Sequence, residues 1–456
     1  MTISASPAGI SSGNSDIAPG RLDSESLKAN FADLHPPLTF HEARVEAERC
    51  YFCFDAPCQQ ACPTSIDVPL FIRQIAAGNR EGAAKTIFDA NIMGGMCARV
   101  CPTETLCEEA CVREIAEGKP VVIGQLQRFA TDALIETGES PYKRGAPTGK
   151  KVAIVGAGPA GLACAHGLAL AGVESTIFEA RPKPAGLNEY GIAAYKTVDN
   201  FAAKEADFIL SIGGIEVKYS VALGKDVSLE DLRRDYDAVF LALGLGATNK
   251  LGLANEELEN VADAVDYIAD LRQAEDLSTL PVGRRIVVIG GGMTAVDVAV
   301  QSKRLGAETV TMVYRRGEEN MKASAFEREL AQTSGVVLRT NAKPVAIEGH
   351  GSALSGVVFE DTRQHGAAAP GSVFRIEADV LFTAIGQRGE PDVLGGAQIE
   401  VKDGRIVVDG ERRTSLDGVW AGGDCVFGGQ DLTVSAVEDG KQAARSIAAA
   451  LGVATA

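Results

Sequence analysis

The sequence has little positive charge and no long apolar run. Its 44 Lys and Arg residues are outnumbered by 61 Asp and Glu residues, so the formal net charge is −17. Because nucleic acids and anionic membranes attract clustered Lys and Arg, this balance argues against both kinds of partner. No apolar run approaches roughly 18 residues, and residues 1–20 lack a basic start followed by an apolar core. We therefore expect a cytoplasmic protein with neither a membrane span nor an export signal.

Several kinds of catalytic group are also missing. The five histidines do not form a metal-binding group, and no Ser/His/Asp set is evident. Only Cys164 and Cys425 lie outside residues 50–111, and neither has a nearby cysteine in the sequence with which to form a redox pair. Catalysis by a thiol pair is therefore not expected. The length of 456 residues and the apolar fraction of 46% are ordinary for a soluble α/β enzyme of two to four domains.

What the sequence does have is cysteine in two dense runs, which hold eight of its ten cysteines. The first run is Cys50-Tyr-Phe-Cys53-Phe-Asp-Ala-Pro-Cys58-Gln-Gln-Ala-Cys62-Pro63. The second begins Cys97-Ala-Arg-Val-Cys101-Pro102 and continues to Cys107 and Cys111. Close-set cysteines with Cys-Pro endings are typical of ferredoxin-type loops, which hold iron–sulfur clusters through four thiolates. The runs predict two [4Fe-4S] clusters.

Two alternative interpretations of these cysteines are weaker. Structural zinc sites use paired Cys-x2-Cys units, whereas only Cys50 and Cys53 have this spacing. A disulfide framework is typical of small secreted chains, and this chain is long and has no export signal. Iron and sulfide remain the favoured interpretation.

Helical signals surround the cysteine runs. Thr39-Phe-His-Glu42 is a capping box that predicts a helix ending near Glu48, and Asp67 is placed to cap a second helix. Apolar spacing predicts two amphipathic helices over residues 68–88 that cover the clusters. We expect a helical iron–sulfur domain over residues 39–145, preceded by a mobile or loosely docked arm of residues 1–38 to which we assign no chemistry.

A dinucleotide-binding pattern follows. Lys151-Val-Ala-Ile-Val is an apolar strand that leads into a glycine turn and an Ala-rich helix, and the next strand ends at Glu179. In this context the glycines let the backbone approach a pyrophosphate, and the acidic residue is placed for a ribose hydroxyl. The alternative is a glycine turn that binds no nucleotide. The candidate residues are Gly156, Gly158, Pro159, Ala160, Gly161, Glu179, Gly186 and Leu187.

A second glycine turn lies more than 100 residues further on. Here the strand Arg285-Ile-Val-Val-Ile precedes the candidate residues Gly290, Gly291, Gly292, Thr294 and Ala295. Two such folds in one chain predict a two-dinucleotide flavoprotein with FAD in one and a nicotinamide in the other. Gly244 and Gly386 each follow a strand and suggest crossover points between domains, whereas Gly423, Asp424 and Thr433 are placed near the flavin.

These signals predict an α/β fold with two Rossmann-like domains. The FAD domain takes residues 146–254 and 387–456, and the NAD(P) domain is residues 255–386. The strand after the second glycine turn ends at Arg315 and Arg316, where a guanidinium would suit the 2′-phosphate of NADP. The alternative is that both arginines are solvated or stack on adenine, so the nicotinamide is left as NAD(P).

The combination of cofactors indicates a class of reaction. Nicotinamide gives two electrons as hydride, whereas a cluster accepts one electron at a time, and FAD does both. We therefore expect a converter between hydride and single electrons. The sequence has no evident site for a complex organic substrate.

Both cysteine runs, both glycine turns and the Ala421-Gly-Gly-Asp424 ending resemble the N-terminal half of dihydropyrimidine dehydrogenase. They also resemble the small (beta) subunit of bacterial glutamate synthase. The resemblance covers residue 40 to the end and includes the bacterial PreT-type subunits. It implies that Cys50, Cys53, Cys58 and Cys111 bind one cluster, and that Cys62, Cys101, Cys107 and Gln127 bind the other. Spacing alone would make Cys97 the eighth cluster ligand. The alternative to a ligand role for Gln127 is that it is simply a polar residue on a helix face.

The resemblance also implies a partner. Pyrimidine enzymes reduce uracil or thymine on an FMN-bearing TIM barrel, and this sequence has no such region. We expect an electron-input subunit that forms a heterotetramer with a PreA-like barrel protein. Related two-subunit enzymes use NAD, which opposes the interpretation of Arg315 and Arg316. The rivals are a glutamate synthase small subunit, which Gln127 disfavours, and a scaffold with degenerate nucleotide folds, which the intact glycine turns disfavour.

Overall fold

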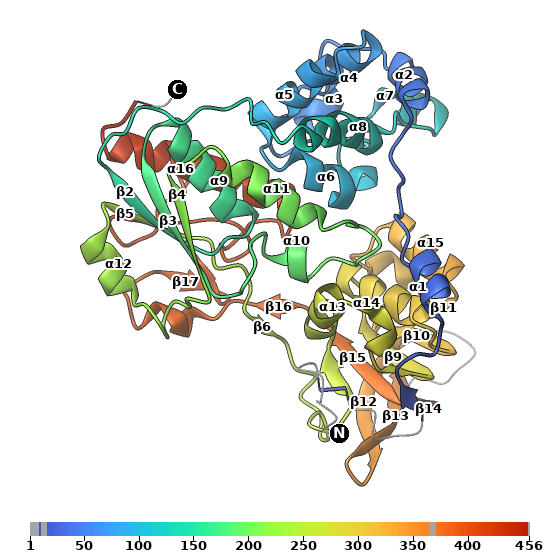
Figure 1. Ribbon diagram of the computed structural model, residues 1–456. Helices are drawn as coiled ribbons and strands as arrows, with labels where there is room; N and C mark the ends of the chain where they lie inside the picture. The colour runs from blue at the N-terminus through green and yellow to red at the C-terminus, as the bar shows by residue number, and fades with distance from the viewer. Residues whose placement is uncertain (1–8, 11–15, 364–370, 455–456) are drawn as a thin grey trace. The chain divides into compact units, whose positions relative to one another are not determined.

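The computed structural model describes residues 9–10, 16–363 and 371–454. The regular elements of residues 40–136 are all helices, and strands and helices are interspersed from residue 151 onward (Figure 1). The tertiary contacts divide it into two compact units. The smaller unit contains the described residues up to Leu34 together with Tyr190–Val198 and Thr248–Gln387. The larger unit contains His35–Glu189, Asp199–Ala247 and the described residues from Arg388 onward.

Short helices form the first part of the larger unit (Figure 1). The predicted capping box is confirmed, because Thr39 and Glu42 exchange hydrogen bonds at the start of α2. Asp67 caps α4 through the Leu70 N–H, also as predicted. Apolar side chains of α4 and α5, such as Phe71 and Ile87, are fully buried. The elements are α2 (Phe40–Glu48), α3 (Pro57–Gln60), α4 (Val68–Ala76), α5 (Arg80–Ala90), α6 (Gly94–Val100), η1 (Thr103–Thr105), α7 (Val112–Glu117) and α8 (Ile123–Glu136).

A five-stranded parallel sheet forms the second part of the larger unit, in the order β19-β5-β2-β3-β4. Its central strand β2 is buried from Val152 to Val155, which explains its continuous apolar sequence. The strands are β2 (Lys151–Val155), β3 (Glu174–Glu179), β4 (Ile215–Tyr219), β5 (Ala238–Leu241) and β19 (Val419–Ala421). The helices are α9 (Pro159–Leu170), α10 (Leu187–Tyr190), α11 (Phe201–Leu210), α12 (Leu229–Asp235) and α16 (Thr433–Ala450). Shorter elements are β6 (Ala247–Thr248), β16 (Gln387–Arg388), η4 (Pro391–Leu394), β17 (Val401–Lys402) and β18 (Arg405–Ile406).

Small residues allow α9 and α16 to pack closely. A Cβ on Gly440 would lie 2.1 Å from the Ala160 carbonyl oxygen, and a Cβ on Gly167 would lie 2.8 Å from the Ala444 methyl. Contacts of this kind exclude larger side chains. The helix after the first glycine turn is therefore fixed directly against the C-terminal helix.

The smaller unit repeats the plan with a parallel sheet ordered β11-β10-β9-β15-β7. In both units the strand before the glycine turn is central. The two parallel sheets confirm the predicted α/β class. The elements of this part are β7 (Val261–Asp263), α13 (Ala264–Gln273), η2 (Leu277–Thr279), β8 (Val282–Gly283), β9 (Arg285–Gly290), α14 (Met293–Arg304), β10 (Thr309–Val313), η3 (Glu318–Asn320), α15 (Ala325–Thr333), β11 (Val336–Arg339) and β15 (Val380–Ala384). A second, antiparallel sheet contains β12 (Ala342–His350), β13 (Ala353–Asp361) and β14 (Val373–Glu377).

The N-terminal segment differs from the expected loose arm over residues 16–34. Its strand β1 (Ile17–Ala18) pairs with β8, and its helix α1 (Ser24–Asn30) buries Leu27. Ile17 and Phe31 join the same apolar core as α13 and α14. Burial of these side chains holds the segment in place, and the sequence analysis missed it because the surrounding residues are small and polar. The rest of the expected arm before residue 16 lies outside the described residues, apart from residues 9–10.

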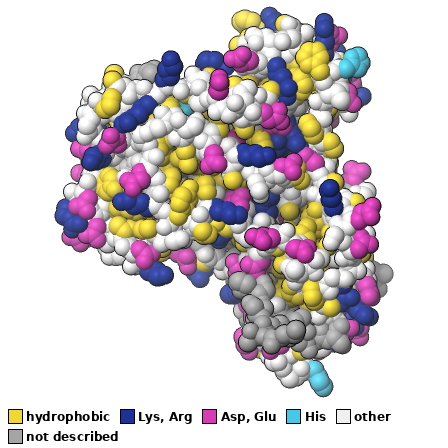
Figure 2. Space-filling model, in the orientation of Figure 1, with side chains coloured by type: hydrophobic (Ala, Val, Ile, Leu, Met, Phe, Trp, Pro, Cys, Tyr) yellow, Lys and Arg dark blue, Asp and Glu magenta, His cyan; other side chains and the backbone are white. Residues whose placement is uncertain are grey.

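Charged side chains of both signs are interspersed over the face shown in Figure 2. In the part of the chain that the structure describes, no helix combines the length and apolar character that a membrane crossing requires.

Candidate functional site

The first cysteine group lines one cavity. Cys50, Cys53, Cys58 and Cys111 border it together with apolar residues of α4 and the start of α8. Burial and the neighbouring thiols Cys50 and Cys111 raise the pKa of Cys58 to about 12, and burial likewise raises the pKa of Cys50. Four thiolates in such a cavity require positive charge to offset burial. The donor set and its surroundings therefore fit an iron–sulfur cluster.

The second cysteine group brings four thiols together. A hydrogen bond with Cys97, burial, and the charges of Cys97, Cys107 and Cys62 raise the pKa of Cys101. Burial, the Glu108 carboxylate and Cys62 raise the pKa of Cys107. Cys97 is itself buried, and its sulfur lies 3.1 Å from Asn91 Nδ2. Cys97 thus lies beside the expected ligands Cys62, Cys101 and Cys107.

Gln127 is the other candidate for eighth ligand. It is buried on α8, and its Nε2 donates a hydrogen bond of 2.6 Å to the Gly94 carbonyl at the start of α6. Because α6 carries Cys97 and leads into Cys101, this contact places the Gln127 amide against the helix of the second group. The assignment of the eighth ligand to Gln127 stays a prediction.

Among the described residues, no three His, Cys, Asp or Glu side chains meet closely enough to hold a single metal ion. In a four-iron cluster each thiolate binds a separate iron atom, so the ligands surround a cube.

A buried carboxylate that was not among the predicted residues joins α6 to α11 within the larger unit. Glu205 on α11 is fully buried and accepts hydrogen bonds from the N–H groups of Gly95 and Met96. Arg99 lies over the Phe201 ring at 3.3 Å and pairs with Asp132 at 2.8 Å. A signal was present in the sequence, because Glu205 falls on the apolar stripe of α11.

The first glycine turn has the close approaches that a pyrophosphate site requires. Gly156 has φ +103°, and a Cβ there would lie 2.3 Å from the Ala242 carbonyl oxygen. A Cβ on Gly161 would lie 2.0 Å from the Gly156 carbonyl oxygen. Gly158 is the N-cap of α9, and Pro159 and Ala160 are the first residues of that helix. Gly186 precedes Leu187, the first residue of α10, and a Cβ on Gly186 would lie 2.9 Å from the Gly158 Cα. Glycine at these positions lets the backbone form a compact turn at the N-terminus of α9, which fits a phosphate site.

Glu179 lies at the end of β3, beside this turn. Its carboxylate accepts hydrogen bonds from the N–H groups of Ala157, at 2.7 Å, and Arg181, at 2.8 Å. Burial raises the pKa of Glu179, and these two hydrogen bonds act in the opposite direction and lower it. The carboxylate is thereby fixed next to the turn, in a position that fits a ribose hydroxyl.

The remaining flavin candidates lie near the start of α16. Burial and the Asp431 charge raise the pKa of Asp424 to about 7. The preceding Gly423 donates its N–H to Asp439, a contact that the sequence analysis missed. Thr433 donates its hydroxyl to the buried amide oxygen of Asn188, which was missed as well. Gly244 follows β5 with φ +62°. The residues present fit a flavin bound between the glycine turn and α16.

The second glycine turn is built in the same way within the smaller unit. A Cβ on Gly290 would lie 2.4 Å from the Ala384 carbonyl oxygen, two residues before Gly386. A Cβ on Gly291 would lie 2.5 Å from the ring of Tyr314. Gly292 caps α14, whose first turn contains Thr294 and Ala295. This turn therefore fits a second dinucleotide.

Tyr314 was missed as part of this region. It follows β10, and its hydroxyl donates to the Asn320 carbonyl at 2.8 Å. Arg315 and Arg316 are both exposed, and the Arg316 guanidinium lies 5.7 Å from the Tyr314 ring centre. Both arginines are therefore available to a ligand at the end of β10.

A buried ion triad anchors α14. Lys196 Nζ lies 2.7 Å from a carboxylate oxygen of Asp297 and 2.7 Å from one of Glu327. Asp297 also accepts the Ala193 N–H at 3.2 Å. The segment Tyr190–Val198 is thereby tied to the helix that begins at the second glycine turn.

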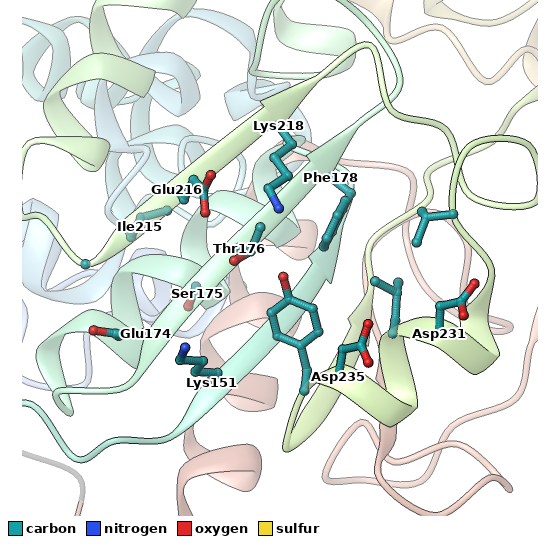
Figure 3. A pocket seen from close by; sticks show the side chains of 14 residues that line it. Lys151, Glu174, Ser175, Thr176, Phe178, Ile215, Glu216, Lys218, Asp231 and Asp235 are labelled. Atoms are coloured by element: carbon teal, nitrogen blue, oxygen red, sulfur yellow. The ribbon is translucent and has the colours of Figure 1, made fainter.

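A hollow of about 600 Å³ lies elsewhere, over β3 and β4 of the larger unit (Figure 3). Lys218, Phe178 and Asp235 point into this region from the sheet and from α12. None of the predicted cofactor residues lines it. The hollow is therefore distinct from the candidate cofactor sites.

Comparison with protein families gives two matches. Residues 150–440 match the pyridine nucleotide-disulphide oxidoreductase family. Residues 27–139 match the family described as dihydropyrimidine dehydrogenase domain II, 4Fe-4S cluster. The two matches cover the parts of the chain that contain the glycine turns and the cysteine groups.

Curated relatives match almost the whole chain. The glutamate synthase [NADPH] small chain of Escherichia coli K12 is 35% identical, over 94% of this chain and 96% of the relative. The NAD-dependent dihydropyrimidine dehydrogenase subunit PreT of Salmonella typhimurium LT2 is 37% identical, over 92% of this chain and 97% of the relative. Both kinds of relative are those that the sequence pattern resembles.

Solved structures share the fold over 66% of this chain. Mycobacterium tuberculosis FprA in complex with NADPH has a TM-score of 0.57 at 20% identity, covering 66% of this chain and 84% of that chain. Thioredoxin reductase of T. acidophilum has a TM-score of 0.52 at 22% identity, covering 66% of this chain and 99% of that chain. These likenesses show the fold alone.

Proposed function

The chain is an oxidoreductase of the pyridine nucleotide-disulphide oxidoreductase family, and from this premise we propose that it is the electron-input subunit of a dihydropyrimidine dehydrogenase. NAD(P)H would deliver hydride to FAD, and single electrons would leave through two [4Fe-4S] clusters. The recipient would be an FMN-containing barrel partner that reduces uracil or thymine, within a heterotetramer. The matches of residues 27–139 and of PreT support this proposal.

One observation supports the electron-transfer role. Glu205 of the proposed FAD domain accepts the Gly95 N–H at 2.7 Å, so α6, which carries Cys97 and leads into Cys101, is docked on α11 within one compact unit. Burial of this carboxylate is costly without hydrogen-bond partners, and the Gly95 and Met96 N–H groups supply them. The contact supports a route from flavin to cluster through adjoining parts of the same unit.

The chain's own residues would prepare this route. The glycine turn and the N-terminus of α9 would bind the pyrophosphate of FAD, and Glu179 would orient its ribose. The N-terminus of α16 near Thr433 would stabilise negative charge on the flavin. The cysteine groups would hold the clusters, with Gln127 as the eighth ligand.

A direct test uses the purified protein under anaerobic conditions. NAD(P)H is expected to bleach the flavin absorbance without any partner, and iron analysis is expected to approach two clusters per chain. Protein that binds no flavin, or that carries zinc in the cysteine groups, would contradict the proposal. Comparing NADH with NADPH in the same assay identifies the coenzyme.

A second candidate function is the small subunit of a glutamate synthase. The glutamate synthase relative from E. coli, at 35% identity over 94% of this chain, favours it. Purification with the native partner separates the two candidates. Uracil-dependent oxidation of NAD(P)H supports the pyrimidine enzyme, and oxidation that depends on glutamine and 2-oxoglutarate supports the glutamate synthase.

A further inference from the structure

A loop beside the candidate flavin residues is held by the short strand β18. The loop runs from Asp424 to Thr433, the first residue of α16, and we call it the 424–433 loop. The Ile406 N–H donates to the Cys425 carbonyl at 2.8 Å, and the Phe427 N–H donates to the Ile406 carbonyl at 2.8 Å. The first half of the loop is therefore fixed on the backbone of β18.

The Arg405 side chain holds the second half of the loop. Its Nη1 and Nη2 donate to the two carboxylate oxygens of Asp431 at 2.6 and 3.0 Å. Paired hydrogen bonds between a guanidinium and a carboxylate fix the orientation of both groups and are stronger than bonds between neutral groups. The Arg405 side chain is only 20% exposed, so water screens this pair incompletely. The strand β18 thus contacts the loop through its backbone and through one charged side chain.

The 424–433 loop lies between the two helix N-termini that we assign to the flavin. Just before the loop, a Cβ on Gly423 would lie 3.1 Å from the Ala160 methyl at the start of α9. At its other end, Thr433 begins α16 and donates its hydroxyl to Asn188 at 2.8 Å. A charge on this loop therefore acts close to the candidate flavin site.

Three charged groups of this region interact with one another. Burial and then the Asp431 charge raise the pKa of Asp424 to about 7, and the Arg405 guanidinium acts in the opposite direction. A reduced flavin gains negative charge, which nearby carboxylates disfavour and a nearby guanidinium favours. The balance between Arg405 and the two aspartates therefore bears on the reduction potential of the flavin.

We propose that Arg405 is a positioning residue for the flavin, which fixes the 424–433 loop and offsets the charge of Asp431. The reduction potential of the flavin is thereby higher than the two carboxylates of the loop alone would make it. The inference rests on the proposed function, because it requires FAD in the larger unit. Arg405 acts through Asp431 and the loop, and it does not need to touch the flavin.

Potentiometric titration of the purified protein with its bound flavin measures the effect. Arg405→Gln leaves the Asp431 carboxylate unpaired and is expected to lower the flavin reduction potential, whereas Asp431→Asn leaves the guanidinium unpaired and is expected to raise it. Each variant is expected to change the equilibrium between oxidised and reduced flavin by at least about fivefold at low salt, or about 20 mV for a two-electron couple. Titration at pH 8.5, above the pKa of about 7 of Asp424, keeps that carboxylate ionised.

The opposite signs separate an effect of charge from an effect of structure. Either single variant breaks the same ion pair, so a purely structural role would shift the potential in the same direction in both variants or in neither. The double variant Arg405→Gln/Asp431→Asn restores the net charge and is expected to return the potential to near the wild-type value. Arg405→Lys keeps the charge and is expected to remain near that value. The single-variant shifts are expected to shrink as the ionic strength rises.

Arg234→Gln is the matched control. Arg234 lies on α12 and donates to both carboxylate oxygens of Asp235, at 2.8 and 3.1 Å. Asp235 lines the hollow of Figure 3, where none of the candidate cofactor residues lies. Loss of this second ion pair is expected to leave the flavin reduction potential unchanged.

The outcomes distinguish this inference from the proposed function. Single variants that shift the potential in the same direction, or that do not shift it, would overturn the role of Arg405. If Arg405→Gln does not retain flavin, the sign of the shift in Asp431→Asn decides, because only an effect of charge raises the potential there. Flavin that NAD(P)H fails to reduce would overturn the proposed function alone, since chemical reduction still gives the potentials of all variants. Wild-type protein that binds no flavin would overturn both.

Discussion

The Glu205 carboxylate accepts a hydrogen bond of 2.7 Å from the backbone N–H of Gly95, which connects α11 to α6, the helix that carries Cys97. The N-terminus of α6 has unpaired N–H groups, and a carboxylate satisfies them. Because the carboxylate is fully buried, its burial raises the pKa of Glu205 to about 8. This contact is the basis of the first two predictions.

Glu205 is expected to make stability depend on pH. The pKa of Glu205 in the folded state is raised above the ordinary value of 4.5. Its contribution to the free energy of unfolding is therefore complete below pH 4.5 and is lost as the pH rises through about 8. The Glu205→Gln variant lacks this titration. Its apparent melting temperature, measured at a fixed scan rate from pH 5 to 8.5, is expected to fall less steeply than that of the wild type. Parallel profiles for the two proteins would contradict this assignment.

Gly95→Ala is expected to disturb the junction between α6 and α11. The new Cβ would lie 2.6 Å from the Phe201 ring and 2.7 Å from Glu205 Oε1, which requires these groups to shift and costs about 1–3 kcal/mol. Electron transfer from reduced flavin to the clusters, followed by stopped-flow absorbance, is expected to slow while flavin bleaching by NAD(P)H persists. Gly410→Ala is the control, since a Cβ there meets nothing within 4 Å. Equal rates in both variants would show that the junction tolerates the shift.

Gln127→Leu is expected to change the spectrum or potential of one cluster and to leave hydride uptake by FAD intact. The variant removes the amide that contacts Gly94 at 2.6 Å. Cys97→Ser is the companion variant, because Cys97 lies beside Cys101. Electron paramagnetic resonance of the reduced protein distinguishes the two. A cluster signal that changes in Cys97→Ser and not in Gln127→Leu would make Cys97 the eighth ligand.

Arg315→Ala/Arg316→Ala is expected to raise the KM for NADPH about tenfold or more and to leave the KM for NADH nearly unchanged. The reason is that two exposed guanidinium groups at the end of β10 suit a 2′-phosphate. The measurement is the rate of flavin reduction against the concentration of each coenzyme. Equal effects on the two coenzymes would indicate that the arginines contact the adenine and leave the 2′ position alone.

Much of the architecture was predictable because local signals agreed with the tertiary packing. The Thr39–Glu42 capping box and the Asp67 cap begin helices as expected. The strands before Gly156 and Gly290 became the centres of two parallel sheets, since continuous apolar strands are stable when both faces are covered. The docked segment at residues 16–34 was not predicted, because its few apolar residues carry no strong periodicity and are buried only against distant helices.

The sequence by itself determined the chemistry that the chain offers: cysteine runs suited to iron and sulfide, two glycine turns suited to dinucleotides, and an acidic surface. These features depend on residue type and on short spacing along the chain, so they can be recognised in the sequence without knowledge of the tertiary structure. Only the tertiary structure decided that Cys97 lies beside Cys101, that Glu205 holds α6 against α11 and that Lys196 joins Asp297 and Glu327. Except for the thiols, these partners are separated by about 100 residues or more along the chain. Only folding brings their charged and polar groups into contact.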